Sequence, residues 1–262
     1  MQISNTLASE EYQEIQRLLA TLPDKSVSLS QMWQLMDQVW DDLGCDNLIL
    51  DQEKITAFYK HPVWLLNGFF IEQHEVSLQH RHIIADLIVQ LSVKHVLDFG
   101  GGFGTLARII ANKSGNIEID IYEPYPNNFA IEECKDYPLI QFVHNLHKKY
   151  DCLVSTDVLE HVTDPLQIFE NMIETVSLNG YLIIANCFRP VIKCHLPSTF
   201  HFRYTFNLFA RLMGLKVLGK CKGKHATIYQ KIHKRPTNWK IIRTIEYLSQ
   251  KTYFYILRHL HK

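Results

Sequence analysis

The sequence predicts an α/β fold, a doubly wound and mostly parallel sheet with helices on both faces. Two observations predict it. Short apolar runs alternate with segments of helical periodicity from Val93 to about Ile232, which is the pattern of a parallel sheet. The first run breaks into glycines at 100, 102 and 104 directly after Asp98 and Phe99, as a buried strand does when it turns sharply into a helix.

Seven strands are expected, and the last two should form an antiparallel hairpin. They lie in residues 95–99, 117–122, 140–143, 150–155, 180–186, 215–221 and 226–232. The residues before them show helical patterns, and a basic stretch rich in aromatic residues follows them. We therefore expect a helical N-terminal lid region (1–92), a core (93–235) and a basic aromatic C-terminal helix (236–262).

Composition and charge narrow the class of protein. The chain has 262 residues, 47% of them hydrophobic and 21% charged, which is ordinary for a globular protein. Its formal net charge is zero, so no nucleic-acid partner is expected. Without a long apolar run, a signal peptide or a C-x-x-C pair among its six cysteines, it is expected to be soluble and cytoplasmic.

Acidic residues at two strand ends predict a nucleoside site. Glu123 follows the second strand, where a carboxylate can accept hydrogen bonds from both hydroxyls of a ribose. The glycines form G-x-G-x-G, and Thr105 stands where a dinucleotide-binding turn has its third glycine. Asp98 would repel a pyrophosphate but suits an ammonium or sulfonium group. A cationic nucleoside is therefore favoured over a dinucleotide.

These residues resemble the class I S-adenosylmethionine-dependent methyltransferases. The likeness rests on Val96 to Gly104, on Glu123 and on the block Tyr150 to Pro165. It is strongest to the small-molecule branch, which includes ubiquinone-biosynthesis O-methyltransferases and sugar and natural-product enzymes. The resemblance implies a Rossmann-like seven-stranded sheet and S-adenosylmethionine as cofactor. It implies as cofactor-binding residues Asp98, Gly100, Gly102, Glu123, Asn145, Ser155 and Thr156.

Three histidines are candidate catalytic bases. Methyl transfer often needs a base to take the acceptor's proton, and an imidazole can do so at neutral pH. His161 follows the fourth strand, whereas His195 and His201 lie in the Pro- and His-rich stretch after the fifth. The alternative for His161 is that Glu160 and His161 cap the next helix and pack against the cofactor.

The same loop carries residues that could form a metal site. Asp157, Glu160 and His161 carry side chains that can bind a divalent ion, and some ubiquinone-type enzymes use a similar group in that way. A cap or a network beside the cofactor is the favoured alternative. The cysteines and histidines between 187 and 225 match no usual zinc spacing. No metal ligand is therefore predicted.

Two segments could bind the acceptor. Arg203 could hold a carboxylate or phosphate, with Tyr204 beside it, or both could pack on the surface. The aromatic segment before the core is interrupted by Gly68 and could form a loose lid, in which Trp64 and Phe70 exclude water from the sulfonium. Packing of these two aromatics against the core is the alternative.

The C-terminal stretch combines apolar and basic residues at helical spacing, among them Trp239, Ile242 and Lys251. Such a helix can lie on an anionic membrane surface, or it can dock on the core or on a partner subunit. Docking is favoured because polar residues interrupt the apolar face. The oligomeric state stays open.

The sequence therefore predicts an enzyme that transfers a methyl group to a small molecule or to a sugar of a glycan precursor, at an oxygen atom. N-methylation and intramolecular cyclisation are alternatives with the same cofactor. A non-catalytic S-adenosylmethionine-binding subunit is the alternative from another class. The glycine spacing and Asp98 disfavour a dinucleotide oxidoreductase.

Overall fold

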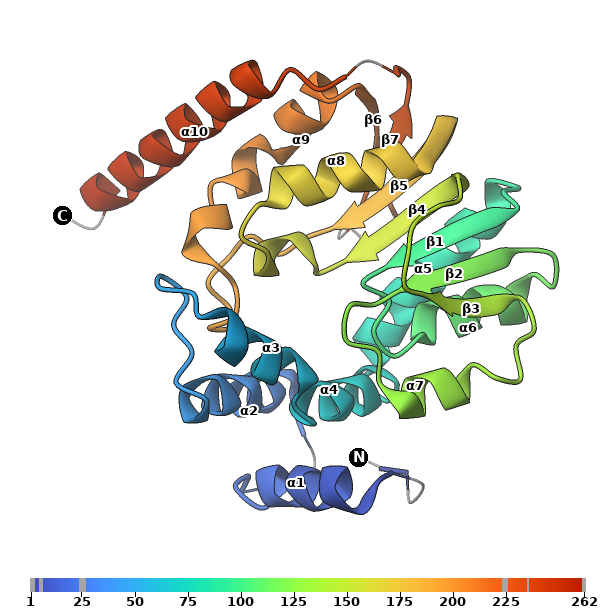
Figure 1. Cartoon of the computed structure of the whole chain (residues 1–262), viewed down its shortest axis with the longest axis vertical. Coiled ribbons are helices and arrows are strands. Elements are labelled where there is room, and N and C mark those ends of the chain that lie inside the picture. The colour runs from blue at the N-terminus through green and yellow to red at the C-terminus, as the bar shows by residue number, and fades with distance from the viewer. Residues whose placement is uncertain (1–2, 5–6, 24–26, 223–225, 235, 261–262) are drawn as a thin grey trace.

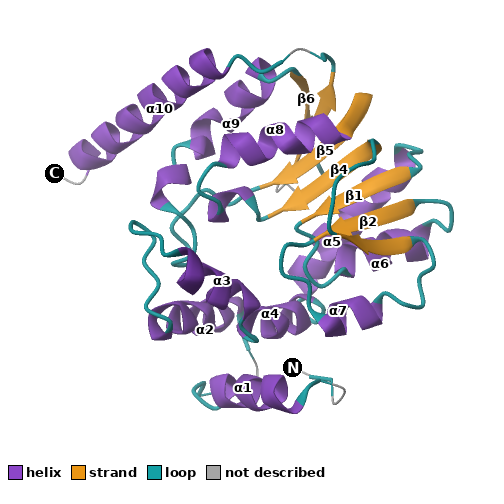
Figure 2. Cartoon of the chain, in the orientation of Figure 1, coloured by secondary structure: helices purple, strands orange, loops and turns teal. Residues whose placement is uncertain are grey.

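A computed structural model describes residues 3–4, 7–23, 27–222, 226–234 and 236–260. Its centre is a seven-stranded sheet with the strand order β3-β2-β1-β4-β5-β7-β6 (Figures 1 and 2). The strands are β1 (His95–Phe99), β2 (Glu118–Tyr122), β3 (Ile140–Val143), β4 (Tyr150–Thr156), β5 (Val176–Ala185), β6 (Leu215–Lys220) and β7 (Thr227–Lys231). β1 to β5 pair in parallel, and β7 pairs antiparallel with both β5 and β6. The predicted fold class and the terminal hairpin are confirmed.

Side chains that alternate along the strands fill two separate cores, one on each face of the sheet. Val96 and Ile183 face the core built with α5 (Glu75–Gln90) and α6 (Thr105–Lys113). Their neighbours Leu97 and Ile184 face the core built with α8 (Pro165–Thr175) and α9 (Phe202–Leu212). The central strands β1 and β4 and the second half of β5 are buried on both faces, which explains why they read as nearly continuous apolar runs in the sequence.

The N-terminal helices form a third core beyond the carboxyl ends of the parallel strands. They are α1 (Ser9–Leu19), α2 (Leu29–Asp42), α3 (Gln52–Lys60) and α4 (Val63–Ile71). In Figure 1 the arrowheads of β4 and β5 point toward α3 and α4. The short helix α7 (Asn128–Glu133) also joins this core, through Ala130. The helices therefore lie over the edge of the sheet where ligands bind in such folds.

The connection from β3 to β4 contains no helix. Residues 144–149 cross from the edge strand to the centre of the sheet as a loop. The loop brings Lys148 to Asp120, a buried carboxylate on β2 that also accepts a hydrogen bond from the Tyr150 hydroxyl at 2.7 Å. A basic residue on the loop thus compensates the charge that β2 carries into the interior.

The helix α10 (Trp239–Leu260) docks along α9 on one side and is exposed on the other. Ile242 is only 1% exposed, and the Trp239 indole donates a hydrogen bond to Glu170 on α8 at 3.1 Å. Arg243 forms an ion pair with Asp164, the residue that caps α8. No helix in the described part of the chain is long and apolar enough to cross a membrane. All six cysteines are free thiols.

The expected interruption at Gly68 is wrong. α4 continues through this residue, which is buried in the helix. A Cβ built on Gly68 would lie 2.4 Å from the ring of Phe103, so the missing side chain lets Phe103 pack against the helix. On the same side, Glu72 accepts a hydrogen bond from the Thr105 hydroxyl at 2.9 Å and pairs with Arg108. These contacts fasten the N-terminal helices to the first helix of the core, so the segment is packed rather than loose.

We predict that Gly68→Ala lowers the free energy of unfolding. Overpacking costs roughly 1–3 kcal/mol, and a gain of up to about 1 kcal/mol in helix propensity offsets part of it, which leaves a net loss of about 1–2 kcal/mol. Gly115→Ala is the matched control, since no atom lies within 4 Å of its Cβ position. Urea unfolding that gives the two variants equal stability would contradict the role assigned to the contact between Gly68 and Phe103.

Candidate active site

Polar side chains gather where β1, β2, β4 and β5 end. Asp98 lies on β1, Glu123 follows β2, Ser155 is the second-last residue of β4, and Asn186 follows β5. The carboxyl ends of parallel strands meet at one edge of a sheet. The strand order β2-β1-β4-β5 therefore makes these four positions neighbours in space.

The glycine-rich turn is held by the carboxylate of Glu123. The Gly102 amide donates to one carboxylate oxygen at 3.1 Å, and the Tyr125 amide donates to the other at 3.2 Å. The Gly100 amide donates to the carbonyl of Tyr122 at 2.7 Å. At Gly102 the φ angle is +51°, and a built Cβ would meet no atom within 4 Å. The turn therefore presents bare backbone to open space, where a ligand can approach it closely.

Asp98 lies beneath this turn with one carboxylate oxygen that has no hydrogen-bond partner. The residue is 2% exposed. Burial raises the pKa of Asp98 to about 7, the guanidinium of Arg81 lowers it, and the carboxylate of Glu123 raises it further. A cation placed against Asp98 would relieve the cost of burying its charge.

The chain leaves β4 through a strained residue. Asp157 has a φ angle of +55°, a left-handed conformation that few residues other than glycine adopt, and its amide donates to the carbonyl of Ala185 at 2.7 Å. A short 3-10 helix, Leu159–His161, follows at once. It carries Glu160 into the interior, where one carboxylate oxygen accepts a hydrogen bond from the Cys187 amide at 2.5 Å.

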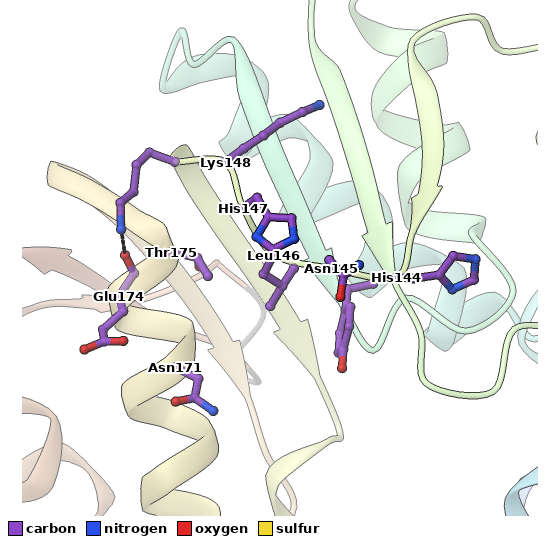
Figure 3. Close-up of a pocket in the computed structure, with 10 residues that line it drawn as sticks. His144, Asn145, Leu146, His147, Lys148, Asn171, Glu174 and Thr175 are labelled. Carbon is purple, nitrogen blue, oxygen red and sulfur yellow. Dashed lines mark hydrogen bonds between the residues drawn. The ribbon is translucent and has the colours of Figure 1, made fainter.

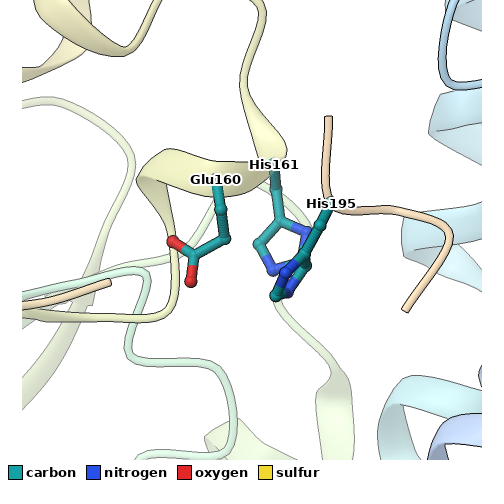
Figure 4. A group of neighbouring side chains, drawn as sticks. All are labelled: Glu160, His161 and His195. Atoms are coloured by element: carbon teal, nitrogen blue, oxygen red, sulfur yellow. The ribbon is translucent and has the colours of Figure 1, made fainter. Parts of the chain in front are cut away.

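His161 and His195 lie next to each other, with their ring centroids 4.7 Å apart and their planes at 80° (Figure 4). The Nδ1 atom of His161 is 3.2 Å from the carbonyl oxygen of Cys194, and that of His195 is 2.7 Å from the carbonyl oxygen of Arg189. Burial lowers the pKa of His161 to about 3, with a further lowering from His195, and burial also lowers the pKa of His195. Both imidazoles are therefore neutral at physiological pH.

The segment that carries His195 is tied to α2. The backbone amide of Lys193 donates to Asp37 at 2.7 Å, and its ammonium group pairs with Asp41 at 2.5 Å. The Asn47 side chain donates to the carbonyl of Lys193 at 3.0 Å. The N-terminal helices thus set the position of the loop as well as covering the site.

An aromatic wall stands beside the two histidines. The rings of Tyr59 and Trp64 stack at 5.2 Å, and each lies 6.2 Å from the ring of His161. Tyr125, two residues after Glu123, stacks on Tyr59 at 6.0 Å. Trp64 therefore lies beside His161. Phe70 does not share this wall: it packs in the N-terminal core and stacks on His74 at 4.8 Å.

Three other candidate residues have different surroundings. The Nδ1 atom of His201 is 2.7 Å from the hydroxyl of Ser249 on α10, and its ring packs on Phe202. Arg203 and Tyr204 lie on the exposed surface of α9, where the guanidinium stacks over the Tyr204 ring at 5.1 Å. Both side chains thus lie on the surface, as in the alternative expected for them, and the role of Arg203 and Tyr204 in binding the acceptor stays a prediction.

Asn145 lines a pocket of about 370 Å³ between the β3–β4 loop and α8 (Figure 3). The wall also includes Tyr122, the residue before Glu123, and the C-terminal turn of α8. Asn145 is exposed, so its amide is open to a ligand. Neither His161 nor His195 lines this pocket, which is separate from the wall of aromatic residues.

Buried polar atoms without partners mark the edge of the sheet as a binding site. Nearly all buried polar atoms in folded proteins are hydrogen-bonded, so exceptions need an explanation. Among the described residues six such side-chain atoms lack a partner. Five of them lie at strand ends or in the layer above: Asp98 Oδ2, Ser155 Oγ, Asn186 Oδ1, Glu160 Oε2 and Trp64 Nε1. A polar ligand bound here would satisfy them.

Sequence reasoning missed several residues of this site. The expected strand 180–186 includes Asn186, whereas β5 ends at Ala185, so Asn186 stands among the polar residues at the strand ends. Tyr125 could have been predicted from the sequence, since it lies two positions after Glu123, the residue expected to bind the ribose. Tyr59, Asp37 and Asp41 carry no local signal, because only the fold brings α2 and α3 to the edge of the sheet.

Comparison with known proteins identifies the family. A family model described as a methyltransferase domain matches residues 73–213, more than half of the chain. The chain belongs to the methyltransferase-domain family. The cofactor that goes with this family is S-adenosylmethionine, as the sequence analysis expected.

The curated relatives of this methyltransferase-domain protein share about a quarter of their residues with it over the matched region. It is 27% identical over 137 residues to a ubiquinone biosynthesis O-methyltransferase from Vibrio cholerae, which covers 49% of this chain and 56% of the relative. A protein of the same name from Coxiella burnetii is 25% identical over 134 residues, with 47% and 56% covered. The chain therefore spans about half the length of the curated relatives that it matches.

Solved structures support the fold alone. An O-methyltransferase family protein from Burkholderia thailandensis superposes with a TM-score of 0.56 at 16% identity, covering 81% of this chain and 74% of that one. Human N-acetylserotonin methyltransferase, solved in complex with SAM, gives a TM-score of 0.54 at 15% identity, with 84% and 70% covered.

The residues at the strand ends fit S-adenosylmethionine. Its ammonium group can donate a hydrogen bond to the carboxylate oxygen of Asp98 that has no partner, and its ribose hydroxyls are donors for Glu123. The open backbone at Gly102 leaves room for the ligand to approach the turn. The fit therefore rests on charge and space as well as on family membership.

We predict that cofactor affinity falls at low pH because of Asp98. Binding an ammonium group requires the ionised carboxylate, and the pKa of Asp98 in the ligand-free protein is about 7. Below that pH the dissociation constant of S-adenosylhomocysteine should rise by up to about tenfold per pH unit. Calorimetry from pH 8 to 5.5 measures the slope, and Asp98→Asn should bind weakly at every pH. An affinity of wild type that stays constant down to pH 5.5 would contradict the role of Asp98.

Proposed function

We propose that the protein is an S-adenosylmethionine-dependent methyltransferase that methylates an oxygen atom of a small-molecule or sugar acceptor. In this proposal Asp98, Gly100 and Gly102 hold the methionine part of the cofactor, together with Ser155 and Thr156. Glu123 binds the ribose, and Asn145 contacts the adenine edge. The acceptor lies between this cradle and the pair His161 and His195.

The observation that carries the proposal is the set of buried polar atoms without partners around the strand ends. Leaving such a group unsatisfied costs about 1–3 kcal/mol, so five of them in one place weaken the empty protein considerably. A bound nucleoside and a polar acceptor recover this free energy. The cluster of unpartnered polar atoms therefore supports a ligand site more strongly than it supports a purely structural role.

The aromatic wall and the neutral histidines support methyl transfer to a hydroxyl group. S-adenosylmethionine supplies an electrophilic methyl group on a positively charged sulfur. Trp64 and Tyr59 keep water away from the reacting atoms, which favours the loss of charge as the methyl moves. The Nδ1 atoms of His161 and His195 face carbonyl oxygens, which leaves each Nε2 lone pair able to accept a hydrogen bond from the acceptor hydroxyl. Because burial lowers the pKa of His161 to about 3 and that of His195 less far, His195 is the better proton acceptor of the two.

We expect His161→Ala and His195→Ala each to lower turnover by about 10²–10⁴-fold, the contribution of a positioned base. Affinity for S-adenosylhomocysteine should stay nearly unchanged, because neither residue belongs to the cofactor cradle. His201→Ala is the comparison variant, since its imidazole is engaged with Ser249; its turnover should stay within a few-fold of wild type. Unchanged turnover in both His161→Ala and His195→Ala would contradict the assignment of the pair.

A second proposal concerns the exposed face of α10, which we assign to contact with an anionic membrane. Ile241, Leu248 and Tyr255 recur every seven residues on this face and are 48%, 56% and 64% exposed. Lys251 lies over the ring of Tyr247 at 4.5 Å and flanks the apolar stripe. A helix with an apolar stripe beside basic side chains suits the interface of a bilayer.

The six free thiols support a cytoplasmic location, because that compartment keeps thiols reduced. Recovery of the protein outside the cytoplasm would contradict this location.

Sedimentation with vesicles of phosphatidylglycerol and phosphatidylcholine tests this contact. Replacing Ile241, Leu248 and Tyr255 together by Ser should weaken vesicle binding by about 10-fold or more, because each apolar side chain buried in the interface contributes about 1.5–3 kcal/mol. Leu178→Ser is the control, since Leu178 is 44% exposed at the start of β5, away from α10. Equal sedimentation of the triple variant and wild type would remove α10 as the contact.

A further inference from the structure

Glu160, His161 and His195 bring three possible metal ligands together. Glu160 and His161 come from the 3-10 helix after β4, and His195 comes from the loop after β5. Each offers one ligand atom, and these atoms lie within 4.8 Å of one another. Figure 4 shows the two imidazole rings lying together with the carboxylate of Glu160 beside them. The sequence separates His195 from the other two by more than thirty positions, so no spacing motif announces the group.

The surroundings of the two histidines fix which nitrogen is free. A carbonyl oxygen can only accept a hydrogen bond, so the Nδ1 atoms that face Cys194 O and Arg189 O must carry the protons. Each Nε2 atom then has an available lone pair. Metal-binding histidines in proteins are usually oriented in this way, with the second nitrogen donating to a carbonyl or carboxylate.

Glu160 is a buried acid without a compensating cation. Its side chain is 0% exposed, one oxygen accepts from the Cys187 amide, and the other oxygen has no partner. No basic side chain in the described ranges forms an ion pair with it. Burial raises the pKa of Glu160 well above its usual range, and the nearby Asp157 raises it further. Buried carboxylates of this kind are normally paired with a cation or bound to a metal.

We propose that Glu160, His161 and His195 bind one divalent transition-metal ion of the zinc class. Two imidazoles and one carboxylate are a ligand set that suits zinc or iron(II), whereas magnesium and calcium prefer oxygen ligands. Zinc–nitrogen bonds are about 2.0–2.1 Å long, which places tetrahedral ligand atoms about 3.3 Å apart. Atoms that lie up to 4.8 Å apart here would therefore approach one another by up to about 1.5 Å when the ion binds.

Three protein ligands leave at least one coordination position open. If the protein methylates an oxygen, as proposed above, that position is available to the acceptor hydroxyl. The acceptor would then be a compound whose hydroxyl oxygen can bind a divalent metal. A bound hydroxyl releases its proton to solvent more readily than a free one, so the two Nε2 atoms would act as ligands in place of a base. Metal binding itself does not depend on this role.

Titration of the full-length, chelator-treated protein with zinc chloride tests the inference. Calorimetry should show one saturable site with a dissociation constant of about 1 µM or lower. Glu160→Gln and His195→Ala should each raise that constant by at least about 10-fold, whereas the exposed His233→Ala should not change it. Magnesium should give no comparable site. X-ray absorption of the zinc-loaded protein should show two imidazoles and a carboxylate oxygen.

Circular dichroism should be measured for each variant to show that it is folded. If folded Glu160→Gln and His195→Ala bind zinc as tightly as wild type, or if wild type has no saturable site, the inference is overturned. Titration of the same metal-free protein with S-adenosylhomocysteine separates the two proposals. Cofactor binding without zinc binding would overturn only the metal site, whereas failure of cofactor binding would count against the methyltransferase assignment.

Discussion

The whole site depends on the cost of holding polar groups at the buried ends of parallel strands. Asp98 and Ser155 lie near the ends of neighbouring strands, where both side chains are almost completely buried. Neither side chain has every hydrogen bond that it could make. A protein tolerates such groups when a ligand completes them. The sheet supplies a rigid frame, and the missing partners define what it binds.

The N-terminal helices are fastened to this frame. Gly68 lets the ring of Phe103 pack against α4, and Glu72 forms an ion pair with Arg108 on α6. Lys193 joins α2 to the loop that carries His195. Packing and ion pairs therefore fix the glycine-rich turn, the aromatic wall and the histidine pair to one another, which is what a preorganised site requires.

The positions of the strands along the chain and the polar residues at their ends could be predicted from the sequence, because both follow from local patterns. Strands buried on two faces read as apolar runs; Asp98 is the second-last residue of one such strand, and Glu123 directly follows another. The surroundings of the side chains after β5 could not be predicted. Proline, histidine and aromatic residues suggested a pocket, but the start of α9 turns Arg203 outward and directs His201 to α10. The pairing of His161 with His195 depends on tertiary contacts that no local pattern encodes.

If the strand ends bind an adenosine that carries an amino acid, the protein must distinguish S-adenosylhomocysteine from a dinucleotide. Calorimetry with S-adenosylhomocysteine and with NAD, on wild type and Glu123→Ala, measures this. Wild type should bind S-adenosylhomocysteine and not NAD. Glu123→Ala should weaken binding by about 10-fold or more, since hydrogen bonds to a charged group contribute roughly 1.5–3 kcal/mol. Binding of NAD with no affinity for S-adenosylhomocysteine would contradict this role of the strand ends.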